Sequence, residues 1–142
     1  MRSFRLYWPA LVVAMIVSFL FEAAWFSYFM NGWLAGIGRT MDWLHQSGMN
    51  PAVQYATAMI CAFVMASVLS IAIQASGEQT IKRGIVCAAV LWLGFVATSW
   101  ATEYIFEVRT LQIYGINVGY CLIDMMLMGA IVGGWKGKPR GV

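Results

Sequence analysis

Four long runs of apolar residues, separated by short polar segments, form the main pattern along the chain. They cover residues 7–30, 52–74, 85–104 and 111–135. Each run reaches the length of roughly 20 residues that a helix needs to cross the hydrocarbon core of a bilayer. Helices satisfy their own backbone hydrogen bonds in lipid, whereas four strands are too few to close a barrel. The pattern therefore predicts an all-α chain with a single transmembrane domain over residues 1–142.

The connections between the runs predict how the helices are arranged. The longest connection, residues 31–50, places Trp33, Ile37, Met41 and Leu44 at helical spacing. This spacing indicates a short amphipathic helix that lies in the membrane interface between the first two spans. The other two connections are short, which makes sequential helices antiparallel neighbours. We therefore expect an antiparallel four-helix bundle.

The composition agrees with a location in the membrane. Of the 142 residues, 61% are hydrophobic and only 11% are charged, whereas soluble domains are about one quarter charged. So few charges cannot cover the surface of a globular protein in water. The composition thus excludes a soluble globular domain and makes the lipid bilayer the expected surrounding.

The basic residues are distributed unevenly across the predicted topology. Seven of the nine lie on the side that carries both termini, and two lie on the other side. The first group is Arg2, Arg5, Lys82, Arg83, Lys136, Lys138 and Arg140, and the second is Arg39 and Arg109. Because cytoplasmic loops are enriched in Lys and Arg, this bias predicts that both termini are cytoplasmic. The net charge of +3 then reflects topology and does not indicate nucleic-acid binding.

The last predicted helix carries a line of glycines. At 100° per residue, four glycines fall within about 40° of one line along the helix. They are Gly115, Gly119, Gly129 and Gly133. Two pairs have the GxxxG spacing that lets helix backbones approach closely in lipid. The opposite face carries the polar residues Asn117 and Asp124, so we expect this helix to contact protein on both sides.

Ionisable and polar residues inside the spans form a candidate polar site. Glu22 and Asp124 lie deep in the first and last spans, Glu103 lies near the end of the third, and Asn117 shares a helix with Asp124. A charge at the bilayer centre costs from about 2.5 to well over 10 kcal/mol, so such residues usually mark a functional site. The alternative is structural, because burial favours protonated carboxyl groups that hydrogen-bond to a neighbouring helix. The sequence leaves both interpretations open.

No pattern of residues indicates catalysis, a metal site or a cofactor. His45 is the single histidine, and Cys61, Cys87 and Cys121 fall within predicted helices without close spacing, which argues against a disulfide framework or a zinc site. The chain contains no GxSxG, CxxC or HExxH motif and no P-loop, so the common signatures of hydrolases, metalloproteases and nucleotide-binding proteins are missing. We therefore expect a protein that is not an enzyme.

The chain resembles the small bacterial membrane proteins grouped as "domain of unknown function 1761". The resemblance rests on Trp25-Phe26, Asn50-Pro51 with Tyr55, Trp92-Leu93-Gly94-Phe95-Val96, Tyr104 with Phe106, Ile116-Asn117 with Gly119-Tyr120, Met128-Gly129-Ala130-Ile131 and Trp135. It implies a four-helix membrane domain in the bacterial inner membrane and no established activity. Glu22 departs from the family pattern, in which a small residue is expected.

Two classes of function agree with these features. The first is a non-catalytic accessory or structural subunit that associates with copies of itself or with other subunits of a membrane complex. The second is a small oligomeric permease, coupled to protons or cations, that uses the carboxyl groups within the membrane. The first class needs fewer special features in the sequence. A permease needs a transport path, and four helices leave little room for one through their own centre.

Overall fold

The structure is a computed structural model that describes residues 4–77 and 79–135, and within these ranges its regular elements are all helices. In chain order they are α1 (Trp8–Gly36), α2 (Met41–Gln46), α3 (Pro51–Ser76), α4 (Ile81–Leu91), the π-helix η1 (Trp92–Ala97), α5 (Thr98–Phe106) and α6 (Leu111–Gly134). Because α4, η1 and α5 follow one another without a break, they form one long span. The prediction of an all-α chain with four helices long and apolar enough to cross a membrane is confirmed.

The first span is longer than its apolar run and ends within the segment expected to form an amphipathic helix. α1 stops just before Gly38, which has a left-handed backbone (φ +67°). Here the amide of Arg39 donates to the carbonyl oxygen of Leu34 (2.9 Å), as in the Schellman motif that ends many helices. The hydroxyl of Thr40 then caps α2. The residues whose spacing predicts an amphipathic helix within residues 31–50 are thus divided between the end of α1 and the short α2.

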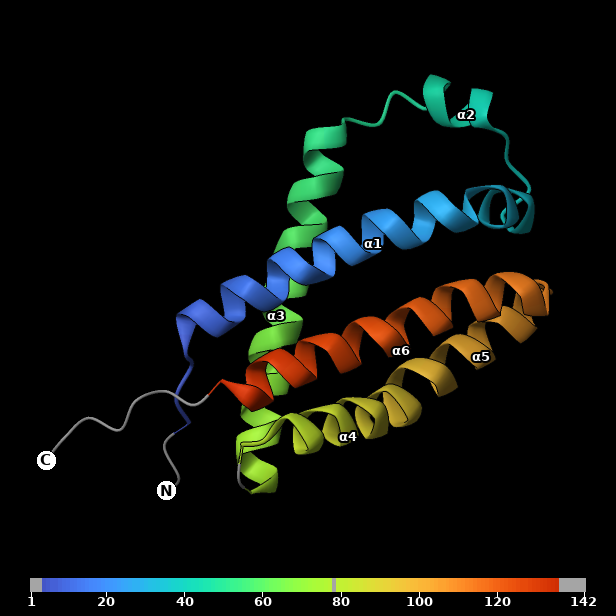
Figure 1. The fold of residues 1–142 in the computed structure, drawn as a ribbon. Helices are drawn as coiled ribbons and strands as arrows, with labels where there is room; N and C mark the ends of the chain where they lie inside the picture. Colours follow the sequence, from blue (N-terminus) through green and yellow to red (C-terminus); the bar gives the residue numbers. More distant parts are fainter. Residues whose placement is uncertain (1–3, 78, 136–142) are drawn as a thin grey trace, which may run out of the picture.

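Three of the four spans are aligned and the fourth crosses them. α1, the α4–α5 span and α6 run along one another, with α6 antiparallel to both, while α3 crosses them steeply (Figure 1). The buried residues of α3 begin at Ala62, whereas residues 51–57 are all exposed. The molecule therefore differs from a regular four-helix bundle, because the first half of α3 diverges from the other spans.

A core of aliphatic side chains joins the four spans near the beginning of α1 and the end of α6. Its fully buried members include Leu11 of α1, Leu69 and Ile73 of α3, and Met128 and Val132 of α6. Small side chains accompany them at Ala10, Ala14, Ala66 and Ala88. Small residues let helices approach closely, which matters in lipid because packing, and not exclusion of water, brings the helices together.

The closest approach between spans is that of α4 and α6. Gly84 of α4 faces Gly129 and Gly133 of α6, and each backbone occupies the space where a side chain of the other would lie. A Cβ atom added to Gly84 would overlap the carbonyl group of Gly129, and one added to Gly133 would lie 2.6 Å from the carbonyl oxygen of Thr80. Such overlaps involve backbone atoms, so the contact requires glycine at these three positions.

Two hydrogen bonds link the π-helical segment of the third span to α6. The indole N–H of Trp92 donates to the carbonyl oxygen of Val118 (2.9 Å), and the hydroxyl of Tyr114 donates to the carbonyl oxygen of Ala97 (2.9 Å). A π-helical turn interrupts the regular pattern of helix hydrogen bonds. These side chains give backbone carbonyl groups additional donors in a region where lipid supplies none.

Replacing Gly84 with Ala is expected to lower the free energy of unfolding by about 1–3 kcal/mol, the usual cost of forcing an extra group into a packed contact. Gly115→Ala is the matched control, because a Cβ atom added at Gly115 meets nothing within 4 Å and Ala is the better helix former. Reversible unfolding of the full chain in a mild detergent measures both variants. Equal stabilities would show that α4 and α6 do not depend on this glycine contact.

Candidate functional site

Asp124 of α6 is buried against α1, with only 2% of its surface exposed. One of its carboxyl oxygens, Oδ2, accepts a hydrogen bond from the hydroxyl of Ser18 on α1 (3.0 Å). The other, Oδ1, has no hydrogen-bond partner among the residues that the structure describes. Leaving a buried polar atom without a partner costs about 1–3 kcal/mol. Asp124 is therefore a buried carboxyl group whose hydrogen bonding is only half satisfied by the described residues.

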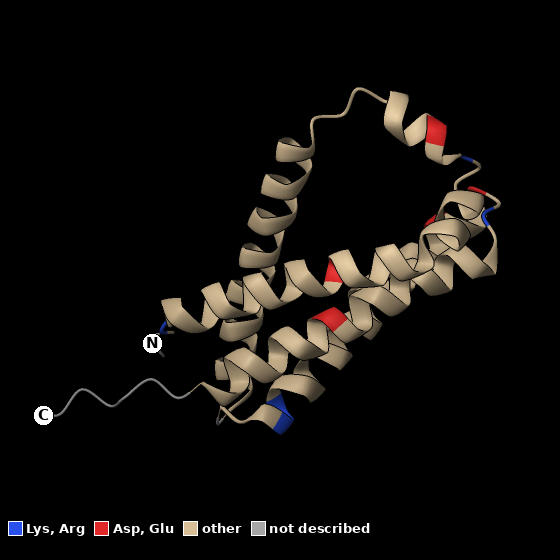
Figure 2. Cartoon of the chain, turned by 45° about the horizontal axis from the view of Figure 1, so that its top comes forward, with Lys and Arg blue, Asp and Glu red and all other residues tan. Residues whose placement is uncertain are grey.

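Glu22 lies one helical turn after Ser18 on α1 and is half-buried. Because Ser18 donates to Asp124, Glu22 lies only four residues, or roughly 6 Å along the axis of α1, from that contact. Figure 2 shows acidic positions in the middle of two of the long helices, away from the charged ends of the spans. In the described ranges Glu22 forms no ion pair, and the pair found there joins Arg109 to Glu107 in the turn between α5 and α6. The structure thus brings together the two carboxyl groups that the sequence places deepest in the membrane.

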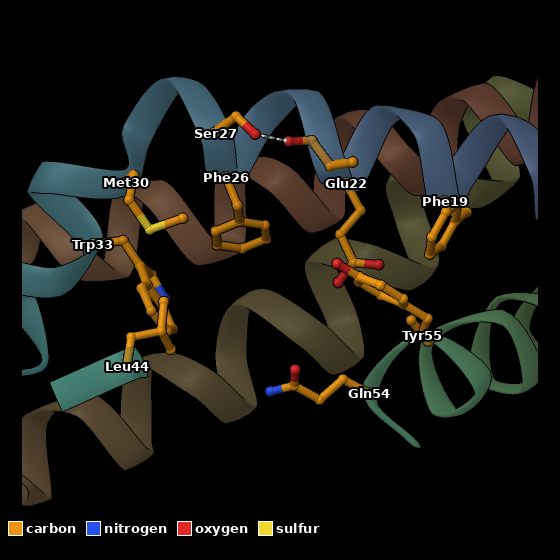
Figure 3. A pocket seen from close by; sticks show the side chains of 11 residues that line it. Phe19, Glu22, Phe26, Ser27, Met30, Trp33, Leu44, Gln54 and Tyr55 are labelled. Atoms are coloured by element: carbon orange, nitrogen blue, oxygen red, sulfur yellow. Dashed lines mark hydrogen bonds between the residues drawn. The ribbon is translucent and has the colours of Figure 1, made fainter. Parts of the chain in front are cut away.

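Glu22 also lines a groove of about 440 Å³ between α1, α2 and the diverging half of α3 (Figure 3). The walls are mostly aromatic and aliphatic. The lining residues are Phe19, Glu22, Ala23, Phe26, Ser27, Met30, Trp33, Leu44, Gln54, Tyr55 and Ala58. The Glu22 carboxyl group extends from α1 toward Tyr55 of α3 (Figure 3). The hydroxyl of Ser27 donates to the carbonyl oxygen of Ala23 in its own helix (2.6 Å), which leaves Glu22 and Gln54 as the main polar side chains of the groove.

Aromatic side chains fill the contact between α1 and α6 beside the two carboxyl groups. Tyr120, one turn before Asp124, stacks on Phe21 with ring centroids 5.8 Å apart and lies against Phe26 at 5.2 Å. The indole N–H of Trp25 donates to the carbonyl oxygen of Ile116 on α6 (3.1 Å). Since Phe26 also lines the groove, one ring connects the groove to the buried contact around Asp124.

The other two residues of the sequence-predicted polar site lie elsewhere. The side-chain amide of Asn117 donates to the hydroxyl of Tyr104 on α5 (2.5 Å), so this buried residue links α6 to α5. Glu103 is exposed near the end of α5. The four candidates therefore do not form one cluster. The site consists of Asp124, of Ser18, which donates to it, and of Glu22, one turn further along α1.

The glycines of α6 also separate into two groups. Gly129 and Gly133 are buried against α4. In contrast, a Cβ atom added at Gly119 would make only an ordinary contact with Trp25, at 3.8 Å, and one added at Gly115 would meet nothing within 4 Å. No group of three His, Cys, Asp or Glu side chains in residues 4–77 and 79–135 is close enough to hold a metal ion. The chemistry of the site is thus that of two carboxyl groups, a hydroxyl group and aromatic rings.

The groove was not predicted from the sequence, although a signal for part of it is present. Phe19, Glu22, Phe26, Met30 and Trp33 are separated by three or four residues, which places them on one face of α1. A carboxyl group on an aromatic helix face is unusual in lipid and marks this side of α1. The sequence does not mark the residues that α2 and α3 contribute to the groove. These residues lie near α1 only because of how the chain folds between the spans.

Comparisons with known proteins identify a family but no function. A family model described as a protein of unknown function, DUF1761, matches residues 9–133. No curated protein and no solved structure matches the chain. The matched region contains both carboxyl groups, the whole groove and the glycine contact between α4 and α6.

Proposed function

The chain belongs to the DUF1761 family, as its residues predict, and we propose that this member is a non-catalytic integral membrane protein that acts as an accessory or structural subunit. The observation that supports this role is the first half of α3, where residues 51–57 are all exposed. Helices in lipid associate by packing against one another. A half-span without a close partner in its own chain is therefore a suitable surface for another subunit.

One exposed face of α3 extends that surface into the second half of the helix. Thr57, Cys61, Val64 and Val68 recur at spacings of three or four residues, and all four are exposed. At 100° per residue they lie on the side of α3 away from its buried residues. We assign this face to a contact with a second copy of the chain, which makes the protein a homo-oligomer. A different membrane subunit on the same face is the other outcome that the experiment below distinguishes.

Oxidation of membranes that contain the full chain is expected to produce a covalent dimer through Cys61, since this exposed thiol lies in the assigned face. Cys61→Ser should abolish the dimer, whereas Cys87→Ser, at a half-buried position of α4, should not. Non-reducing electrophoresis measures the cross-link, and native mass spectrometry after gentle extraction measures the assembly. A cross-link to another protein would identify a complex subunit. A monomeric mass without any cross-link would contradict the subunit role.

We also propose that the chain lies in the bacterial inner membrane with both termini in the cytoplasm. α1 begins and α6 ends at the same end of the molecule (Figure 1). Arg5 precedes α1 at that end, and Lys82 and Arg83 lie in the first turn of α4 there, whereas Arg39 follows α1 and Arg109 follows α5 at the opposite end. The other basic residues, Arg2, Lys136, Lys138 and Arg140, lie outside the described residues. This distribution supports the orientation, because Lys and Arg are enriched on the cytoplasmic side.

Reporter fusions before Met1 and after Val142 are expected to be active only as cytoplasmic reporters. The physical reason is that the seven basic residues on that side resist transfer across the membrane. An alkaline phosphatase fusion, which needs the periplasm, serves as the opposite control at each terminus. A periplasmic signal from either fusion would contradict the proposed orientation.

A specific observation favours a second candidate function, a small oligomeric permease coupled to protons or cations. Asp124 has a buried carboxyl oxygen without a described partner, and Glu22 connects this region to an open groove. Carboxyl groups within a membrane are the usual relay groups of proton and cation carriers. In an oligomer, the two groups offer successive binding positions between the groove and the interior.

If the permease proposal holds, Glu22→Gln and Asp124→Asn should each abolish proton or cation flux in liposomes without unfolding the protein, because both changes preserve shape and remove the charge. Asp42→Asn is the matched control, since it removes one carboxylate from the exposed helix α2. A pH-sensitive dye and cation-selective electrodes report the flux. No flux from a correctly assembled protein, or unchanged flux in both variants, would reject the permease and leave the subunit role.

A further inference from the structure

The groove between α1 and α3 surrounds one carboxyl group with aromatic rings. Glu22 reaches into it between two pairs of rings (Figure 3). Phe19 and Tyr55 form one pair, with ring centroids 5.6 Å apart, and Phe26 and Trp33 form the other, at 6.0 Å. The face of an aromatic ring is electron-rich and attracts cations. The carboxyl group and the rings therefore favour the same kind of ligand.

Within residues 4–77 and 79–135, no Lys or Arg side chain pairs with Glu22. In a region of low dielectric constant an opposite charge interacts with a carboxylate far more strongly than it does in water. We propose that the groove binds a lipophilic organic cation, in which an ammonium group carries an apolar substituent. The ammonium group contacts Glu22 and the ring faces, and the apolar part lies along Met30, Leu44 and Ala58.

Other occupants fit these groups less well. An acyl chain of a lipid fills the apolar walls but leaves the Glu22 carboxyl group without a partner. A calcium ion takes six to eight oxygen ligands, whereas the groove offers mainly the carboxyl group of Glu22 and the amide oxygen of Gln54. An organic monocation needs only one carboxylate together with the aromatic faces, and this is what the groove provides.

The size and position of the groove agree with a ligand that arrives from the bilayer. Its volume of about 440 Å³ lies within the range of about 300–1,000 Å³ typical of small-molecule sites. Leu44 of α2 contributes to one end of the groove, and the divergence of α3 from α1 opens the space between them (Figure 1). Binding here is an equilibrium property, so it does not depend on the subunit role or on flux through the protein.

Titration calorimetry of the full chain in an uncharged detergent tests the proposal with two matched probes. The first is trimethyl(2-phenylethyl)ammonium, and the second is its uncharged isostere, in which carbon replaces nitrogen. The cation should bind about ten times more tightly than the isostere. Glu22→Gln should remove this preference by weakening the cation alone, and Tyr55→Ala, at a 58% exposed position, should weaken both probes.

Asp42→Asn serves as the charge control, because Asp42 does not line the groove. It should leave the affinity for the cation unchanged within twofold. Equal affinities for the two probes would show an apolar groove that lipid fills, and would overturn the proposal. Absence of binding, or an equal loss of cation affinity in Asp42→Asn and Glu22→Gln, would overturn it as well. If Glu22→Gln fails to fold, two measurements still test the proposal. They are the preference of the unmodified protein for the cation over the isostere, and the loss of affinity in Tyr55→Ala.

Discussion

The contact of Gly84 with Gly129 and Gly133 determines where the other spans lie. In lipid, helices gain little from excluding water, so their arrangement depends on how closely their surfaces pack. The three glycines bring the backbones of α4 and α6 together, because each occupies the space of the missing side chain of the other. With α4 on one side, α6 has its remaining faces available for α1 and for the second half of α3. It is the most buried of the four spans as a result.

The central position of α6 explains why the buried polar groups are found there. Asn117 and Asp124 lie inside protein and not against acyl chains, and each meets a donor or acceptor of a neighbouring span. The burial of Asn117 is explained by its hydrogen bond to Tyr104, which links α6 to α5. The burial of Asp124 is explained only in part, because Ser18 donates to only one of its two carboxyl oxygens. This unsatisfied oxygen is the observation behind the permease candidate, because ionisable groups inside a membrane often mark a functional site.

Hydropathy predicts the number of spans because crossing a bilayer requires long apolar helices. The positions of Glu22 and Asp124 deep within their apolar runs identify them as candidate site residues. The path of α3 is not predictable in this way. Ile60 is 64% exposed and Ile73 is fully buried, yet both are isoleucines in one apolar run, so residue type does not distinguish a lipid-facing position from a core position. The spacing of the glycines in α6 predicts a close helix contact. Gly84, however, is the single glycine of α4, and nothing in the sequence identifies it as the residue that α6 contacts. The groove follows from the path of α3 and was missed for the same reason.

The divergence of α3 places two surfaces on one helix. Tyr55 and Ala58 face the groove, whereas Cys61 and Val64 lie on the exposed side. Because the first half of α3 has few close contacts, its position relative to α1 is held mainly by what lies on these two sides. On the two proposals, a ligand that draws Tyr55 toward Glu22 would also move Cys61 and Val64, and a second subunit that packs on Cys61 and Val64 would change the width of the groove. The two proposed binding events are therefore expected to be coupled, and each would then change the affinity of the other by the same factor.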